Sequence, residues 1–439
     1  MKSNSTHKIF VAIALLFLSF QGCKSKQPIE EDTYTKSANI NFKLTENEEK
    51  LLDVYGLRNL YNDLKENKSQ EILERFLYAA DSVHQITFGT IKKIGPNDQA
   101  TTIKALAQAY QTYRTEFFRI EGLIRLYRKI GRYKDFMEPL YTNESKSGLR
   151  PKFGIKQTED TLGKFGEMAM NLKFSQDLNA SPQVLSFQST NLDKSFVSLS
   201  TLIKSDWLPD SQGQIPYFTR LFSELSKNKK VLLSNEDENS KIVKILADEL
   251  EDFDSKVLDF ESLENGYHEL RRNLRWIPIL VVSFDGLIYP DVTAGSSGVP
   301  EYEAVMSLPS VTEGKYFKAL KLMRRPKAFK RFPISLYAAS AYYAEQIGYI
   351  KDIWQTYDAL IEAYKNSGLN AIDAETTAKK LLLDHGYKEV DYSPALVQDL
   401  ATTKPLILMK FAPHGRDVSR LVKGKETGIF KKVAKFLKK

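Results

Sequence analysis

The chain has 439 residues, of which 42% are hydrophobic and 11% aromatic, so it can bury one large core or two medium ones. Its formal charge of +8 favours acidic partners. The single cysteine, Cys23, excludes an intramolecular disulfide and any metal site built on paired cysteines.

The first residues are typical of an export signal. A polar start with two lysines precedes an apolar run over residues 9–20, and Cys23 follows shortly afterwards. The run is shorter than the roughly 20 apolar residues of a comfortable membrane-spanning helix. Residues 1–22 are therefore predicted to be a lipoprotein signal peptide, with Cys23 acylated and the protein anchored to a membrane of the bacterial cell envelope, in the outer membrane or on a periplasmic face. Phe20 and Gln21 are unusual before such a cysteine, so ordinary cleavage or an uncleaved anchor stay open.

The next segments are predicted to be a tether and then helices. Residues 23–44 are polar and acidic, as expected of a flexible tether. Thr45 and Glu48 form a capping box that opens a helix, and Gly131 is expected to cap a later helix at its C-terminus. Apolar residues recur at helical spacing over residues 69–94, 100–130, 134–140, 158–174, 214–227, 241–253, 258–276, 315–330, 334–347 and 351–366.

These patterns predict an all-α fold over residues 45–400. Two apolar runs, residues 277–288 and 406–411, are rich in β-branched residues, which predicts a short strand pair in or near the second half. The loop over residues 293–300 has no counterpart in the first half.

Two stretches of the chain, residues 130–135 and 347–352, share the pattern I-G-x-x-K-D. Each has a histidine upstream that is followed by cations, His84 in the first half and His268 in the second. The echo suggests an internal duplication, with repeats over about residues 71–145 and 241–366.

The cations after the second histidine form a stripe. Arg271, Arg272 and Arg275 lie 3, 4 and 7 residues after His268, which places all four on one helix face. Such a stripe favours a bound anion, because like charges repel unless something neutralises them. The alternative is that acidic residues of the protein itself, such as Glu264, pair with these arginines.

Two further basic segments follow. One carries Lys321, Arg324, Arg325 and Lys327 among apolar residues, as expected of a helix with a cationic outer face or of a solvated basic surface. The other is the C-terminal extension, residues 401–439, which ends in a basic amphipathic pattern. That helix is expected to lie on an anionic membrane, extend an anion site or pack on the body.

The ordered set of motifs resembles the CHAD family, the conserved histidine α-helical domains. The second half fits the family's histidine motif at His268, Leu270, Arg271, Arg272 and Arg275, and its glycine-aspartate turn at Gly348, Lys351 and Asp352. The first half fits at His84, Ile86, Lys92, Lys93, Gly131, Lys134 and Asp135. Thr87 stands where an arginine is expected, and Pro278 and the insertion after it also depart from the family pattern.

The resemblance implies two similar helical-bundle lobes around a basic groove that binds inorganic polyphosphate or another polyanion. The site it implies comprises His84, Lys92, Lys93, Lys134, His268, Arg271, Arg272, Arg275, Lys321, Arg324, Arg325, Lys327 and Lys351. The two histidines are as readily structural as functional. No cofactor, metal, specific nucleic acid or enzymatic activity is expected, because the sequence lacks the corresponding motifs. The alternative function is a non-enzymatic envelope scaffold that keeps the fold without the ligand.

Overall fold

The computed structural model describes residues 43–142, 153–233, 241–242, 245, 263–284, 287–291, 300–321, 323 and 330–386, which belong to one compact unit. The predicted signal peptide, Cys23, nearly all of the predicted tether and the C-terminal extension lie outside these residues, as does the strand predicted for residues 406–411. Within the described part of the chain, no helix is both long enough and apolar enough to cross a membrane.

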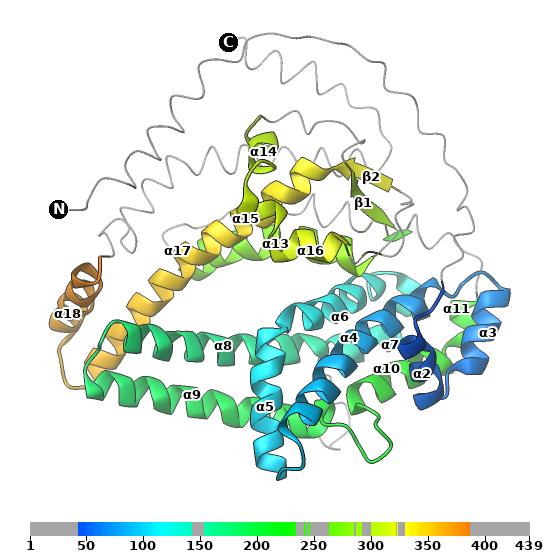
Figure 1. Cartoon of the computed structure of the whole chain (residues 1–439), viewed down its shortest axis with the longest axis horizontal. Coiled ribbons are helices and arrows are strands. Elements are labelled where there is room, and N and C mark those ends of the chain that lie inside the picture. Colours follow the sequence, from blue (N-terminus) through cyan, green and yellow to red (C-terminus); the bar gives the residue numbers. More distant parts are fainter. Residues whose placement is uncertain are drawn as a thin grey trace, which may run out of the picture. The chain divides into compact units, whose positions relative to one another are not determined.

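The described residues are overwhelmingly helical, which confirms the all-α prediction (Figure 1). The first part of the chain forms α2 (Glu46–Val54), α3 (Arg58–Glu66), α4 (Glu71–Ile94), α5 (Gln99–Thr112), α6 (Arg114–Tyr127) and α7 (Gly131–Tyr141). The middle forms α8 (Ile155–Asp177), α9 (Pro182–Leu202), the π-helical turn η2 (Ile203–Trp207), α10 (Pro216–Lys227) and α11 (Lys229–Leu232).

The last part of the chain contains the longest helix and a small sheet. Its elements are η3 (Leu263–His268), α13 (Glu269–Ser283), β1 (Ile288–Asp291), α14 (Pro300–Val305), α15 (Pro309–Thr312), α16 (Lys315–Lys321), β2 (Lys330–Pro333), α17 (Ile334–Asn366) and α18 (Ala371–Asp384). β1 and β2 pair in parallel, with Ile288 opposite Lys330.

The predicted capping box at the start of α2 is confirmed. The Glu48 amide donates to the Thr45 hydroxyl at 3.3 Å, and the Thr45 amide donates to the Glu48 carboxylate at 2.8 Å. The two bonds satisfy amide groups that the first helical turn would otherwise leave without an acceptor.

The strand predicted for residues 277–288 is wrong, because α13 continues through Ser283. Its β-branched residues, among them Ile279 and Val281, are buried against neighbouring helices. Burial of this kind outweighs the weak β preference of such side chains. Pro278 lies inside the helix, where it removes one backbone donor without ending the helix.

Three predicted helix boundaries are also wrong. The helix expected over residues 100–130 is broken at Tyr113 into α5 and α6. Gly131 begins α7 and does not cap a C-terminus. The helices expected over residues 334–347 and 351–366 are one continuous helix, α17, so the second glycine-aspartate motif lies inside a helix and not in a turn.

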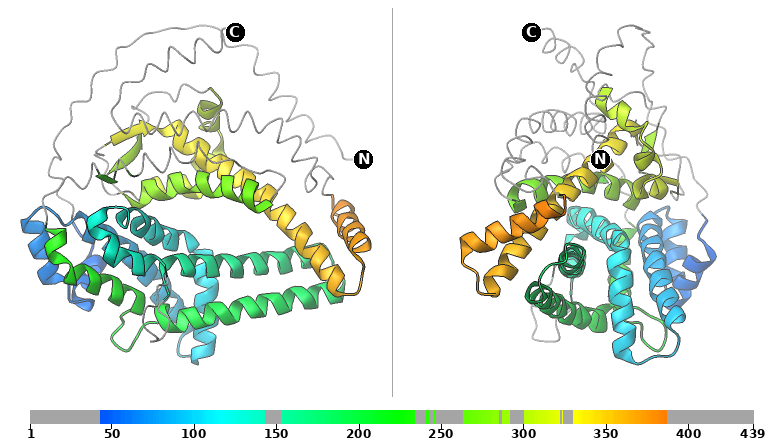
Figure 2. Two further views of the ribbon diagram at one scale, coloured as in Figure 1. Left: turned by 180° about the vertical axis from the view of Figure 1, so that it is seen from behind. Right: turned by 60° about the vertical axis from the view of Figure 1, so that its left-hand side comes forward.

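The main core is built around α6, which packs against α4, α7, α8 and α13. Figures 1 and 2 show α6 between α13 on one side and α8 on the other. Every residue from Phe117 to Ile124 is buried. A helix enclosed in this way contributes most of its stabilisation through packing and little through intrinsic helix propensity.

A second, smaller core lies at the far end of α17. It joins the C-terminal ends of α8 and α17 with α9 and α18, and its buried residues are Leu178, Ala180, Val184, Ile353, Leu360, Ala363, Tyr364, Ala374, Ala378 and Leu382. α8 and α9 run side by side toward this end (Figure 1).

A close contact between two helices of the main core is made at Gly122 of α6. A Cβ atom at this position would lie 3.2 Å from Ser283 Oγ and 3.3 Å from Leu280 Cδ2, both on α13. The glycine therefore lets α13 approach α6 more closely than any other residue would allow.

Replacing Gly122 with Leu is expected to force α6 and α13 apart and lower the free energy of unfolding by about 1–3 kcal/mol. Denaturant unfolding of the full chain measures this loss. The matched control is Gly89→Leu in α4, where a Cβ would meet no atom within 4 Å. An equal loss of unfolding free energy in both variants would show that the close contact at Gly122 does not contribute to stability.

Candidate anion-binding site

The candidate site lies where α13 packs against α17. Gly348 of α17 faces α13, and a Cβ atom there would lie 2.7 Å from Nε and 3.0 Å from Cζ of Arg271. The guanidinium of Arg271 therefore rests against the backbone of α17, in space that only a glycine leaves open.

Lys351 follows Gly348 by less than one turn of α17. Its side chain is 13% exposed, and its Nζ lies 3.4 Å from Asp352 Oδ1 and donates to the Gln355 side-chain oxygen. Burial lowers the pKa of Lys351, and the positive charge of Arg271 lowers it further, while Asp352 and Glu167 act in the opposite direction. The charge of Arg271 therefore acts on Lys351. We treat the two cations as one site.

The charges at this site are unbalanced. Arg271 is half-buried and makes no hydrogen bond or ion pair with any residue that the structure describes. Glu167, the second carboxylate that influences Lys351, already pairs with Lys164 at 2.8 Å. Among the described residues, Asp352 is the carboxylate within 4 Å of Lys351, so the described part of the site has a positive excess.

A second arginine of the fold also lies against a glycine, but its charge is neutralised by a carboxylate. Arg114 of α6 lies against Gly163 of α8, and it donates to the carboxylate of Glu159 and, at 3.2 Å, to the main-chain oxygen of the same residue. Arg271 lies against Gly348 in the same way, but no described carboxylate pairs with it.

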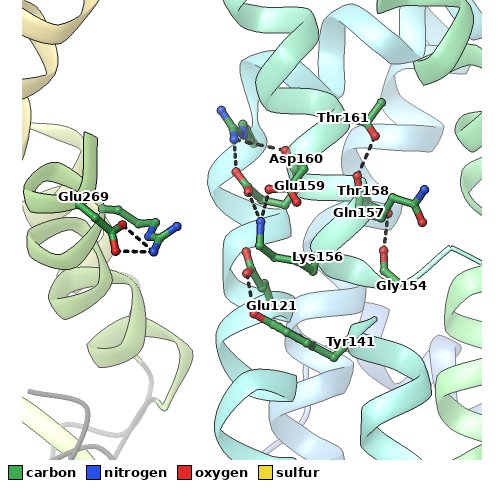
Figure 3. Close-up of polar contacts among 12 residues, drawn as sticks. Glu121, Tyr141, Gly154, Lys156, Gln157, Thr158, Glu159, Asp160, Thr161 and Glu269 are labelled. Atoms are coloured by element: carbon green, nitrogen blue, oxygen red, sulfur yellow. Dashed lines mark hydrogen bonds and ion pairs between the residues drawn. The ribbon is translucent and has the colours of Figure 1, made fainter. Parts of the chain in front are cut away.

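The other arginines of the predicted stripe have different partners. Arg272 pairs with Glu269 one turn earlier, with 2.5 Å between Nη2 and Oε2 (Figure 3). The guanidinium of Arg275 lies 4.1 Å from the centre of the Phe118 ring on α6. The three arginines of the stripe therefore lie in three different surroundings. Arg271 is the one whose charge acts on Lys351 among the described residues.

The predicted histidines lie on different elements, His84 on α4 and His268 at the end of η3. His84 is 8% exposed, lies 2.7 Å from the Tyr55 hydroxyl through Nε2, and stacks with Phe88. Burial lowers its pKa to about 4, so His84 is uncharged at neutral pH. His268 is half-buried where η3 meets α13.

The remaining predicted cations do not join Arg271 and Lys351 within the described residues. Lys92 and Lys93 are exposed at the end of α4 that leads to α5, on the side away from α13 in Figures 1 and 2. Lys134 is exposed on α7. Lys321 ends α16, its side chain lies outside the described residues, and so do Arg324, Arg325 and Lys327.

A buried acidic cluster was not predicted from the sequence. Glu121 of α6 is 2% exposed, and its Oε1 accepts a 3.4 Å hydrogen bond from the Tyr141 hydroxyl of α7 (Figure 3). Its Oε2 is buried and has no partner among the described residues. Burial raises the pKa of Glu121 to about 7, and Glu159 adds to the rise, while Lys156 and Arg125 oppose it.

The sequence does contain a signal for this acid. Glu121 stands one turn from Phe117, Phe118 and Ile124, so an enclosed α6 would have had to bury it, although Arg125 also lies one turn away. The described residues contain no group of three or more acidic, histidine or cysteine side chains placed to hold a metal ion.

Comparison of the chain with known protein families, curated proteins and solved structures gave no match. No protein-family model matches the chain, and neither a curated protein nor a solved structure does. The resemblance to the CHAD family therefore stays a prediction.

Replacing Glu121 with Gln is expected to stabilise the protein increasingly as pH rises. The folded pKa of Glu121 lies near 7 and the unfolded one near 4.5, so the native carboxyl opposes folding progressively between these values. The full shift corresponds to about 3 kcal/mol. The unfolding free energies of Glu121→Gln and the wild-type protein should therefore diverge between pH 5 and pH 8. Glu66→Gln, at an exposed carboxylate of α3, is the control, and a constant difference for Glu121→Gln would contradict the prediction.

Proposed function

We propose that this protein binds a phosphate-rich polyanion, such as inorganic polyphosphate, and that Arg271 and Lys351 hold one of its phosphate groups. The observation that carries the proposal is the half-buried guanidinium of Arg271 near Lys351, where Asp352 is the close carboxylate among the described residues. A half-buried cation without a counter-charge is costly, and a bound anion removes that cost.

Phosphate suits this pair of groups. A guanidinium grips two phosphate oxygens at once, and an ammonium adds a mobile point charge. The formal charge of +8 favours anionic partners in general. The motif resemblance to the CHAD family points to polyphosphate in particular, and an anchor at Cys23 would place the site in the cell envelope.

The duplication belongs to the same proposal. The two I-G-x-x-K-D stretches are proposed to descend from one repeat and to have diverged. The first begins α7 and carries an exposed Lys134, whereas the second lies inside α17 and carries the half-buried Lys351. The second copy is the one that we propose to bind the ligand.

The alternative function is a scaffold or protein-interaction role without a polyanion. The positions of the other cations favour it, since Arg272 and Arg275 are engaged within the fold and Lys92, Lys93 and Lys134 are scattered. Binding measurements separate the two functions.

Titration of the full chain with polyphosphate should give binding that weakens as salt screens the charges. Arg271→Gln and Lys351→Gln should each weaken it by about tenfold to a hundredfold, the value of one charge-assisted hydrogen bond. A Lys92→Gln, Lys93→Gln double variant removes two exposed cations and should leave most of the affinity. No binding near physiological salt would favour the scaffold. Unchanged affinity with lower stability in Arg271→Gln would mean that Arg271 is paired within the fold.

Replacing Gly348 with Ala separates the position of Arg271 from its charge. The new Cβ must displace the guanidinium, whereas the backbone gains up to about 1 kcal/mol of helix propensity. Gly348→Ala is therefore expected to keep or raise the midpoint of thermal unfolding and still weaken polyphosphate binding. If Gly348→Ala binds polyphosphate as tightly as the wild type, the position of the Arg271 guanidinium against α17 does not contribute to binding.

A further inference from the structure

We propose that Glu121 and Tyr141 form a proton-dependent latch. The latch holds the C-terminal end of α7 on α6 while the Glu121 carboxyl is protonated, and it releases that end when the carboxyl ionises. The proposal goes beyond the anion site, since Glu121 and Tyr141 lie on α6 and α7, whereas Arg271 and Lys351 lie on α13 and α17.

The geometry around Glu121 suits a protonated carboxyl better than a carboxylate. The residue is 2% exposed, and the hydrogen bond from the Tyr141 hydroxyl to its Oε1 is long, at 3.4 Å. Its Oε2 is inaccessible to solvent and has no hydrogen-bond partner among the described residues. A buried carboxylate without donors or a paired cation is strongly disfavoured. Loss of the proton therefore favours a state in which Glu121 reaches water.

The charged groups of α8 beside Glu121 are already engaged with other residues (Figure 3). Glu159 pairs with Arg114, and it disfavours a second negative charge at Glu121. Lys156 favours that charge, but it pairs with Asp160, which disfavours it. Lys156 would therefore neutralise Glu121 only by giving up its present partner.

The other helices around α6 do not supply the missing partner either. Arg125, one turn after Glu121, favours the ionised form, but its guanidinium lies over an aromatic ring of α13. Burial raises the pKa of the phenols of Tyr141 and, on α10, Tyr217, so both stay neutral between pH 5 and pH 8. The buried charged groups of α4, among them Arg75, have hydrogen bonds to other residues.

The last turn of α7 is the part of the structure that we expect to move. Pro139 lies inside this helix and removes one backbone donor from its C-terminal end. Besides the Tyr141 contact, a 3.1 Å hydrogen bond from the Tyr217 hydroxyl to the Leu140 main-chain oxygen holds this end in place. α6, in contrast, is enclosed by four helices. Release of the last turn of α7 therefore brings Glu121 to water without unfolding α6.

The latch is expected to weaken as pH rises. In the closed state, burial raises the pKa of Glu121 to about 7, whereas the exposed carboxyl of the released state has its ordinary pKa of 4.5. The released state therefore loses its proton first, and its population grows by up to about tenfold per pH unit between these two values. Above pH 7 both states are ionised, so the population of the released state levels off.

The test is hydrogen exchange of the full chain between pH 5 and pH 8, followed by mass spectrometry and corrected for the intrinsic pH dependence of exchange. Protection of the amides of Leu140, Tyr141 and Thr142 should fall by up to about tenfold per pH unit until pH 7. Protection of α18, which lies in the small core, should stay constant. Constant protection at the end of α7, or an equal fall in α7 and α18, would overturn the latch.

Glu121→Gln removes the titrating group and keeps its size. Protection at the end of α7 should then be independent of pH. The matched control is Glu138→Gln, which removes a carboxylate of α7 that pairs with Arg128 and should keep the fall in protection. A fall that persists unchanged in Glu121→Gln would overturn the role of Glu121.

Tyr141→Phe removes the hydroxyl and keeps the ring over which Arg128 lies. Protection at the end of α7 should decrease severalfold at pH 5, because one hydrogen bond of the closed state is lost. The fall with pH should persist, because Glu121 stays buried. Unchanged protection at pH 5 would overturn the role of Tyr141.

Discussion

The enclosure of α6 is the constraint on which the rest of this fold depends. Its stretch from Phe117 to Ile124 is buried by four neighbouring helices, yet it contains Arg119 and Glu121. A buried charge needs a partner or must give up its charge. Arg119 pairs with Glu116 at 2.8 Å and lies over the Tyr78 ring, whereas Glu121 has one weak hydrogen bond and a raised pKa.

The same requirement explains how this basic chain uses its arginines. Arg125 lies over Trp276, Arg128 over Tyr141 and Arg132 over Tyr133, with 4.7, 3.8 and 4.7 Å from the guanidinium carbon to the ring centre. A guanidinium over an aromatic face contributes up to about 2 kcal/mol when desolvated. Part of the positive charge is therefore used within the fold, since the contact of Arg125 joins α6 to α13 and that of Arg128 joins the end of α6 to α7. Arg271 differs from these arginines, because it has neither an aromatic ring nor a carboxylate as a partner among the described residues.

The sequence predicted the helical class and many elements, but it could not predict which cations meet. Thr45 and Glu48 carry a local signal, so the start of α2 was predictable. The break at Tyr113 and the unbroken α17 have no local signal, because tertiary packing decides them. Spacing also placed Arg271, Arg272 and Arg275 on one face without showing that α6 and α17 would divide them. The motif at Gly348 marks the glycine against which Arg271 rests, although the expected turn there is wrong.

α17 runs through both cores, and the candidate site lies at the boundary between them. Ile347 belongs to the main core and Ile353 to the small one, with Gly348 and Lys351 between them. A core of ten buried residues is expected to open at a lower free energy than the main core, as local units of proteins do. Opening of the α17–α18 end would draw Lys351 away from Arg271 while the main core stays folded. A ligand that bridges the two cations would therefore hold the two cooperative units together. Its binding would slow hydrogen exchange in α18, a helix that carries none of the site residues.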